Sequence, residues 1–329
     1  MDNHRLQRNH CRYHHQNGTS SNTGAKIYNV HIIDPGEQAV KINDNTAGFP
    51  DNGEIACSTI ELTDTGRNQI ETWDNNPASD PRQLDIKCYT GGVDGHKAKD
   101  WSIRDNVIKG FWCNTGLSEH GVHFWSGSRN INVERNLFIN NARGVGLGLG
   151  DSRPGSRTYT DSPCPGVAAY VGSYGGVIKN NMIIGNDPRL FASPAQQDTG
   201  IALESACETK VIHNTVASTQ VNGYSSIEWR FLGSANNTIS NNLTTYRIID
   251  RGSGSGNIQE GNRDLVSPSI FVNLMQNDAH LNTTALSALG QGVLKPEYKS
   301  LAPTDFDMQE RFPASNPNRN PDIGADQKY

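Results

Sequence analysis

The sequence predicts an all-β fold, a right-handed parallel β-helix, and the main observation behind this prediction is a repeated phrase. The phrase consists of an apolar residue, two mostly polar residues, an asparagine and a second apolar residue, and it recurs every 28 to 45 residues. Its five copies are Ile103-Arg104-Asp105-Asn106-Val107, Val133-Glu134-Arg135-Asn136-Leu137, Ile178-Lys179-Asn180-Asn181-Met182, Val211-Ile212-His213-Asn214-Thr215 and Ile239-Ser240-Asn241-Asn242-Leu243. A repeat of this length is typical of a solenoid.

Short segments of alternating character are the second observation. They are Val93-Asp94-Gly95-His96, Val122-His123-Phe124-Trp125, Val145-Gly146-Leu147-Gly148, Ile201-Ala202-Leu203-Glu204 and Ile227-Glu228-Trp229-Arg230. Alternation indicates strands with one face inside and one outside. We therefore expect two short strands per repeat, joined by Gly and Asn turns, with the asparagine of the phrase in a left-handed conformation. A β-sandwich or propeller would show hairpin turns between paired strands, and such turns are scarce.

The chain divides into three parts. Residues 1–22 are polar and histidine-rich, without the apolar core of a signal peptide, and we expect an irregular segment there. The β-helix is expected over residues 23–270, with a loop insertion at about 151–175 that is long enough to act as a wall or lid. Residues 271–329 are expected to form a final strand and a tail that caps the open end of the solenoid.

Composition agrees with a narrow core and excludes several partners. The chain has 329 residues with 33 Gly and 34% hydrophobic residues. It has no apolar stretch near the roughly 20 residues of a membrane span, and its net charge of −5 argues against general nucleic-acid binding. The six cysteines show no zinc-type spacing. Cys88 and Cys113 lie in adjacent predicted coils, so a disulfide and two isolated thiols are both open.

Aligning the alternating segments predicts three columns of side chains on one outer face. The first column contains Lys41, Asp94, His123, Gly146, Ala202 and Glu228. The second contains His96, Trp125, Gly148, Glu204 and Arg230, and the third contains Gly91, His120, Arg143, Thr199 and Ser225. Since coils lie roughly 4.8 Å apart, these groups would all be within reach of a short oligosaccharide. The alternative is a solvated face with an ion pair between Glu228 and Arg230.

From about residue 24 to 327, with phrases such as Leu117-Ser118-Glu119-His120-Gly121-Val122-His123-Phe124-Trp125, the chain resembles the bacterial right-handed parallel β-helix repeat proteins of the pectate-lyase-like superfold. This resemblance implies a secreted or periplasmic protein. Members of the superfold include polysaccharide lyases, glycoside hydrolases, epimerases, esterases and tailspikes, so the fold alone does not select an activity. The paired aspartates of polygalacturonases and the Asp-Pro-His of alginate epimerases have no close copy here.

The residues of the predicted face favour a polysaccharide lyase acting on a polymer of uronic acids. In such a lyase a base removes the proton next to a carboxylate that a cation has neutralised. Histidine exchanges protons near neutral pH, so His120 or His123 is the expected base. Arg143, Arg230 or Lys41 is the expected cation. The expected substrate-binding residues are Lys41, Asp94, His96, Trp125 and Tyr174.

Two other functions stay open at this point. A glycoside hydrolase would use Glu204 and Glu228 as its two carboxylates, and a non-catalytic β-helix would bind a glycan without cutting it. No cofactor is expected, although the histidines and carboxylates of the face leave calcium or another divalent ion open. We expect a monomer with a polysaccharide partner and no nucleic-acid or membrane partner.

Overall fold

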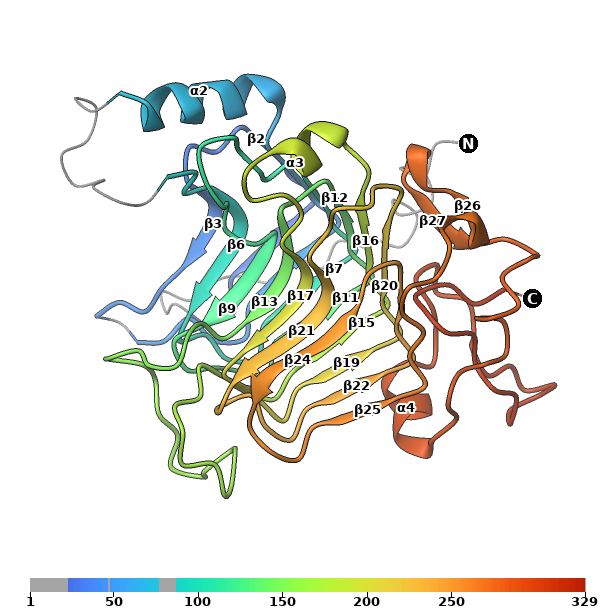
Figure 1. The fold of residues 1–329 in the computed structure, drawn as a ribbon. Helices are drawn as coiled ribbons and strands as arrows, with labels where there is room; N and C mark the ends of the chain where they lie inside the picture. Colours follow the sequence, from blue (N-terminus) through green and yellow to red (C-terminus); the bar gives the residue numbers. More distant parts are fainter. Residues whose placement is uncertain (1–22, 47, 77–86, 329) are drawn as a thin grey trace.

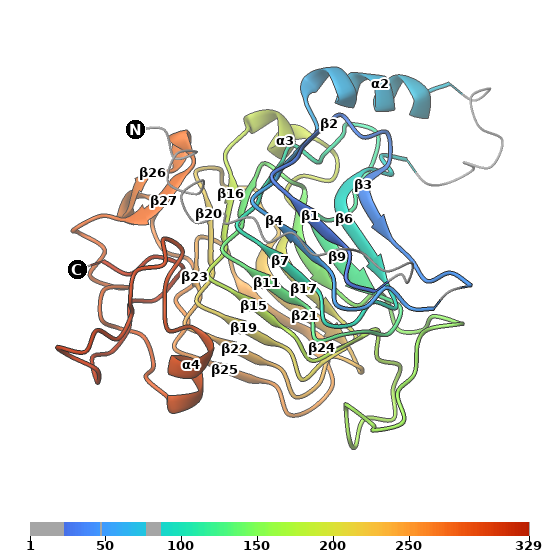
Figure 2. The same ribbon diagram turned by 180° about the vertical axis from the view of Figure 1, so that it is seen from behind.

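The computed structural model describes residues 23–46, 48–76 and 87–328 and shows a parallel β-helix (Figures 1 and 2). The chain winds through three parallel sheets in turn, and we name each sheet after its first strand. The β1 sheet contains β1 (Lys26–Tyr28), β4 (Glu54–Ala56), β7 (Ser102–Arg104), β11 (Asn132–Glu134), β15 (Val177–Lys179), β19 (Lys210–Ile212), β22 (Thr238–Ser240) and β25 (Ile258–Glu260). The β2 sheet contains β2 (His31–Ile33), β5 (Thr59–Glu61), β8 (Val107–Lys109), β12 (Leu137–Ile139), β16 (Met182–Gly185), β20 (Thr215–Ser218) and β23 (Leu243–Thr244). The β3 sheet contains β3 (Gln38–Ile42), β6 (Gly91–His96), β9 (Val122–Trp125), β13 (Arg143–Leu147), β17 (Thr199–Glu204), β21 (Ser225–Phe231) and β24 (Ile248–Ser253).

The repeated phrase forms the corner between the β1 and β2 sheets. A full coil therefore contributes one strand to each of the three sheets, and the prediction of two strands per repeat was wrong. The predicted position of the left-handed residue was also wrong by one. The residue before the asparagine takes the positive φ, as Asp105 (56°) and Arg135 (51°) show. The asparagines of the phrase instead turn inward and form a ladder, in which the Nδ2 of Asn136 donates to the Oδ1 of Asn181 at 3.0 Å and to the carbonyl of Ile103 at 2.9 Å.

The insertion is fastened to the coils beside it, beyond the ends of β9 and β13 (Figure 1). A disulfide joins Cys164 of the insertion to Cys207, and the guanidinium of Arg157 makes two hydrogen bonds to Asp51. A small parallel sheet of β10 (Ser128–Arg129), β14 (Ser173–Tyr174) and β18 (Ala206–Cys207) follows at the next corner. Of the two possibilities left open for Cys88 and Cys113, the structure shows the disulfide. Two helices, α2 (Asp64–Asp74) and α3 (Pro188–Ala192), connect the β2 sheet to the β3 sheet.

The C-terminal tail covers the outer face of the β2 sheet, which differs from the predicted cap over the open end. The tail contains η1 (Pro268–Ile270), β26 (Phe271–Asn273), η2 (Leu274–Gln276), β27 (Asp278–Leu281) and α4 (Pro296–Leu301). Both ribbon views place it along the flank of the solenoid, next to β16 and β20 (Figures 1 and 2). Phe271, Leu274 and Leu281 of the tail pack in one cluster with Leu137 and Ile184, whose side chains point out of the β2 sheet. The physical reason is that this outer face is apolar and needs a cover.

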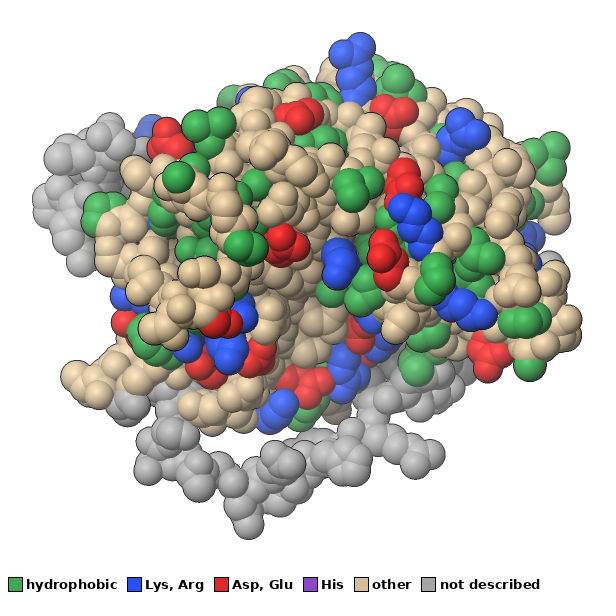
Figure 3. All heavy atoms as spheres, turned by 90° about the horizontal axis from the view of Figure 1, so that it is seen from below, with side chains coloured by type: hydrophobic (Ala, Val, Ile, Leu, Met, Phe, Trp, Pro, Cys, Tyr) green, Lys and Arg blue, Asp and Glu red, His purple; other side chains and the backbone are tan. Residues whose placement is uncertain are grey.

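The described surface carries charges of both signs. On the face drawn in Figure 3, basic and acidic side chains lie close to one another. Among the helices that the structure describes, none has both the length and the apolar character needed to cross a bilayer.

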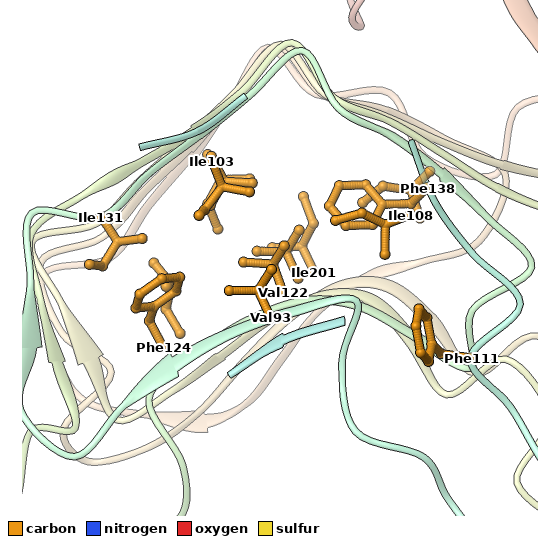
Figure 4. Packing of buried hydrophobic residues seen from close by; sticks show 14 of the residues in the cluster. Val93, Ile103, Ile108, Phe111, Val122, Phe124, Ile131, Phe138 and Ile201 are labelled. Atoms are coloured by element: carbon orange, nitrogen blue, oxygen red, sulfur yellow. The ribbon is translucent and has the colours of Figure 1, made fainter. Parts of the chain in front are cut away.

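The core is a stack of aliphatic and aromatic side chains that point inward from all three sheets (Figure 4). Val93 and Val122 of the β3 sheet face Ile103 of the β1 sheet and Ile108 and Phe138 of the β2 sheet. These side chains are fully or almost fully buried. Because side chains alternate along a strand, the residues between the inward ones point outward from the β3 sheet, and they form the candidate site.

Candidate functional site

Strand pairing confirms the predicted register of the β3 sheet. In the first column Lys41 pairs with Asp94, Asp94 with His123, His123 with Gly146, Gly146 with Ala202, and Ala202 with Glu228. In the second column His96 pairs with Trp125 and Glu204 with Arg230. In the third, Arg143 pairs with Thr199 and Thr199 with Ser225. Alternation places the first two columns on the outer face, and contacts of His120 and Arg143 with Glu119 and of Ser225 with Glu228 bring side chains of the third column to the same face.

Many of these outward-pointing groups are nevertheless buried. Asp94, His120, His123, Glu204 and Glu228 are each at most 5% exposed. The insertion contributes part of the cover, because the guanidinium of Arg153 lies 4.2 Å from the ring centre of Trp125 and the amide of Gly150 donates to Glu204 Oε2 at 3.2 Å. Burial of charged groups is costly unless each has a partner, so the partners decide what each group can do.

Asp94 is the centre of one group of contacts. Its Oδ2 accepts from His96 Nε2 at 3.0 Å and lies 3.2 Å from Lys41 Nζ, and its Oδ1 accepts from Trp125 Nε1 at 2.8 Å. Burial acts to raise the pKa of Asp94, but the hydrogen bond from His96 and the charge of His123 outweigh burial and hold the pKa at about 2. Asp94 is therefore an ionised residue that positions its neighbours, and it is unsuited to act as an acid.

Glu119 joins the two histidines and Arg143 into a second group. Its Oε2 lies 3.4 Å from His123 Nδ1, 3.9 Å from His120 Nδ1 and 3.7 Å from Arg143 Nη2. Burial acts to raise the pKa of Glu119, but the neighbouring imidazoles and the charge of Arg143 outweigh it and lower the pKa. For His123 burial acts to lower the pKa, but contact with the Glu119 carboxylate outweighs it and raises the pKa.

His120 differs from His123 because, among the described residues, its only polar contact is the long one, at 3.9 Å, between Nδ1 and Glu119 Oε2. Within the described residues neither nitrogen of His120 has a hydrogen-bond partner, although the side chain is buried. His123 instead donates from Nε2 to the carbonyl of Gly148 at 2.9 Å. Burial, together with the charges of Arg143 and His123, lowers the pKa of His120 well below its ordinary value, so its imidazole is neutral at neutral pH.

Glu204 and Glu228 are held by arginines. Arg230 Nη2 donates to Glu204 Oε1 at 2.5 Å, while Arg251 Nη1 donates to Glu228 Oε1 at 2.8 Å. The other oxygen of Glu228 accepts from the hydroxyl of Ser225 at 2.7 Å. The predicted ion pair between Glu228 and Arg230 is long, at 4.0 Å, because Arg230 prefers Glu204.

The structure adds and removes members of the predicted site. Glu119 and Arg251 belong to it although the aligned columns contained neither, because Glu119 precedes β9 and Arg251 lies on the terminal strand β24. For Glu119 the available signal in the sequence was its position four residues before His123. Tyr174 does not open onto this face. It lies in the β10 sheet, where its ring packs against Tyr159 and beside the cysteines of the second disulfide.

The comparisons with known proteins add no relatives to this description. No protein-family model matches the chain, and the search of curated proteins finds no match.

Proposed function

We propose that this β-helix cleaves an acidic, uronic-acid-containing polysaccharide by β-elimination at the outer face of its β3 sheet. The observation that carries the proposal is the neutral imidazole of His120, whose nitrogens make no hydrogen bond among the described residues and which has Glu119 as a neighbour in common with the guanidinium of Arg143. Elimination requires a base with a free lone pair and a cation that neutralises the substrate carboxylate. His120 is our candidate for the base and Arg143 our candidate for the cation.

His120 is the proposed base and Arg143 the proposed carboxylate-binding group. Arg143 is held in place by Nε and Nη2, which donate to the carbonyl of Ser118 at 2.9 and 2.6 Å. These bonds leave its Nη1 for a substrate carboxylate. His123 is a poorer base because its Nε2 is already bonded to Gly148 and its Nδ1 contacts Glu119. Because His120 is 1% exposed, substrate binding must move the side chains that cover it.

The hydrolase alternative has less support from the contacts. A glycoside hydrolase needs one protonated carboxyl group as its acid. Glu204 is bound by Arg230 and Glu228 by Arg251, so one oxygen of each carboxylate that would act on a glycosidic bond already has a charged partner. The disulfides Cys88–Cys113 and Cys164–Cys207 are typical of oxidising compartments, which supports a secreted or periplasmic location.

The proposal is tested by absorbance near 235 nm and by release of reducing ends on acidic polysaccharides, with neutral polysaccharides as a control. We expect absorbance to rise only with an acidic substrate, and both His120→Ala and Arg143→Ala to reduce the rate at least about a hundredfold. His31→Ala is the matched control, since His31 lies on β2, outside the β3 sheet.

Two results would contradict the lyase. One is release of reducing ends without a rise in absorbance near 235 nm. If this release were lost in Glu204→Gln and Glu228→Gln, the protein would be a hydrolase. Binding of the polysaccharide without either signal would show a glycan-binding protein.

A further inference from the structure

The described residues contain two groups in which histidine and carboxylate atoms lie within 4.8 Å of one another. One is Glu119, His120 and His123, and the other is His280, Asp307 and Asp326. In the second group both nitrogens of His280 are used, since Nδ1 contacts Asp278 Oδ1 at 2.6 Å and Nε2 contacts Asp307 Oδ2 at 2.8 Å. The His280 group is therefore saturated by its own carboxylates.

The group around Glu119 differs from the His280 group because one of its histidines, His120, makes no hydrogen bond among the described residues. The contact of His123 Nε2 with the carbonyl of Gly148 places the proton on Nε2, because a carbonyl oxygen can only accept. The other nitrogen, Nδ1, faces Glu119, and a metal ion that displaced the proton on Nδ1 would gain its lone pair as a ligand. A histidine whose second nitrogen is fixed by a backbone carbonyl is typical of metal ligands.

We propose that Glu119, His120 and His123 bind a divalent transition-metal ion of the zinc type. Zinc bonds of about 2.0–2.2 Å in a tetrahedral site place ligand atoms about 3.4 Å apart. Glu119 Oε2 lies 3.4 Å from His123 Nδ1 and 3.9 Å from His120 Nδ1, so small side-chain movements complete the site. Two imidazoles and one carboxylate favour zinc or cobalt over calcium and magnesium, which prefer oxygen ligands.

Arg143 opposes this ion. Its Nη2 lies 3.7 Å from the same Glu119 oxygen, so it competes with the metal for the carboxylate and repels a second positive charge. The metal site stands on the geometry of its three ligands and is independent of the proposed reaction. Its consequence for activity rests on the proposed function: a bound ion occupies the lone pair of His120, the proposed base, and inhibits cleavage.

The test is a titration of the chelator-treated full chain with Co²⁺, followed by visible absorption, and then displacement of Co²⁺ by Zn²⁺. His4, His10, His14 and His15 are replaced by Ala throughout, so that they contribute no signal. We expect one equivalent of Co²⁺ to bind. Glu119→Gln and His120→Asn should weaken the affinity at least about tenfold, whereas Arg143→Gln should strengthen it. His280→Gln is the matched control and should leave it unchanged.

Several results would overturn the metal site. They are the absence of a Co²⁺ spectrum, an affinity unchanged by Glu119→Gln, or a loss of binding in His280→Gln. Glu119→Gln keeps the test valid if His120→Asn fails to fold, because the Glu119 side chain is 26% exposed and the change preserves its shape. The lyase is tested separately by absorbance near 235 nm in the presence of chelator. Failure of one proposal is thus distinguishable from failure of the other.

Discussion

His120 occupies space that only a glycine at position 146 leaves free. A Cβ atom built on Gly146 would lie 2.6 Å from His120 Nε2 and 2.8 Å from two ring carbons. The backbone of Gly146 does not adopt a positive φ, so its conformation does not require glycine. Glycine is needed at this position because the imidazole ring of His120 occupies the space that a side chain would fill. The sequence showed a gap at this point of the face, and the structure shows that the gap is filled by His120.

We predict that Gly146→Ala displaces the His120 ring. The methyl group overpacks a buried site, so the free energy of unfolding should fall by about 1–3 kcal/mol. Cleavage at the proposed site and Co²⁺ affinity should both fall. Urea unfolding and the two assays above measure these effects. Gly36→Ala is the control, because a Cβ there meets nothing within 4 Å. A Gly146→Ala protein with unchanged stability and unchanged Co²⁺ affinity would show that His120 does not depend on this space.

At the level of elements, the asparagine ladder connects consecutive coils at the corner between the β1 and β2 sheets. Each rung between the first, Asn106, and the last, Asn262, donates to the next asparagine and to a backbone carbonyl, and its Oδ1 accepts from the rung before it. The Oδ1 of Asn181 accepts from the backbone and the side chain of Asn136 at 3.0 Å, and its Nδ2 donates to Val133 at 2.9 Å. The last rung, Asn262, has one neighbouring rung and is only half-buried.

We predict that Asn181→Leu destabilises the protein by about 3 kcal/mol, since it leaves buried donors and acceptors of Asn136 and Val133 without partners. Asn262→Leu at the end of the ladder should cost about 1 kcal/mol, because fewer buried groups lose partners. Urea unfolding of both variants gives the comparison. Equal losses in the two variants would mean that the ladder does not act through its buried hydrogen bonds.

The sequence predicted the strands of the β3 sheet better than the corners. Side chains alternate with a period of two, so the aligned valines and isoleucines fixed the register from Asp94 to Glu228. The phrase did not reveal the third strand, because its last apolar residue begins a strand of only a few residues. The prediction assigned the left-handed conformation to the asparagine because this residue type favours it. In the structure the asparagine side chain forms the ladder, and the preceding residue, such as Asp105 or Arg135, has the positive φ.

Over the whole molecule, two non-repeating segments cover two faces of the solenoid. The tail lies on the apolar outer face of the β2 sheet, and the insertion contacts the polar outer face of the β3 sheet. Neither placement could be predicted, because a segment outside the repeat has no register that ties it to a sheet. The burial of Glu204 and Trp125, which the insertion and the residue before it contact, could not be predicted for the same reason.

The tail also contains a strong pH-dependent contact, His280 between Asp278 and Asp307. Burial acts to lower the pKa of His280, but the hydrogen bond and charge of Asp307, the charge of Asp326 and the hydrogen bond with Asp278 outweigh it and raise the pKa to about 10. A pKa raised above its ordinary value of 6.5 stabilises the fold fully below pH 6.5, and this stabilisation is lost as pH rises toward 10.

We therefore predict that the stability difference between the wild type and His280→Gln depends on pH in one direction. The difference in the free energy of unfolding should be constant below about pH 6.5, should shrink between about pH 6.5 and 10, and should be small above about pH 10. Urea unfolding at a series of pH values measures it, and the difference between two curves cancels the other titrating groups. Parallel curves from pH 5 to pH 10 would show that His280 is not held as an imidazolium. A difference that grows with pH would show that its pKa is lowered instead.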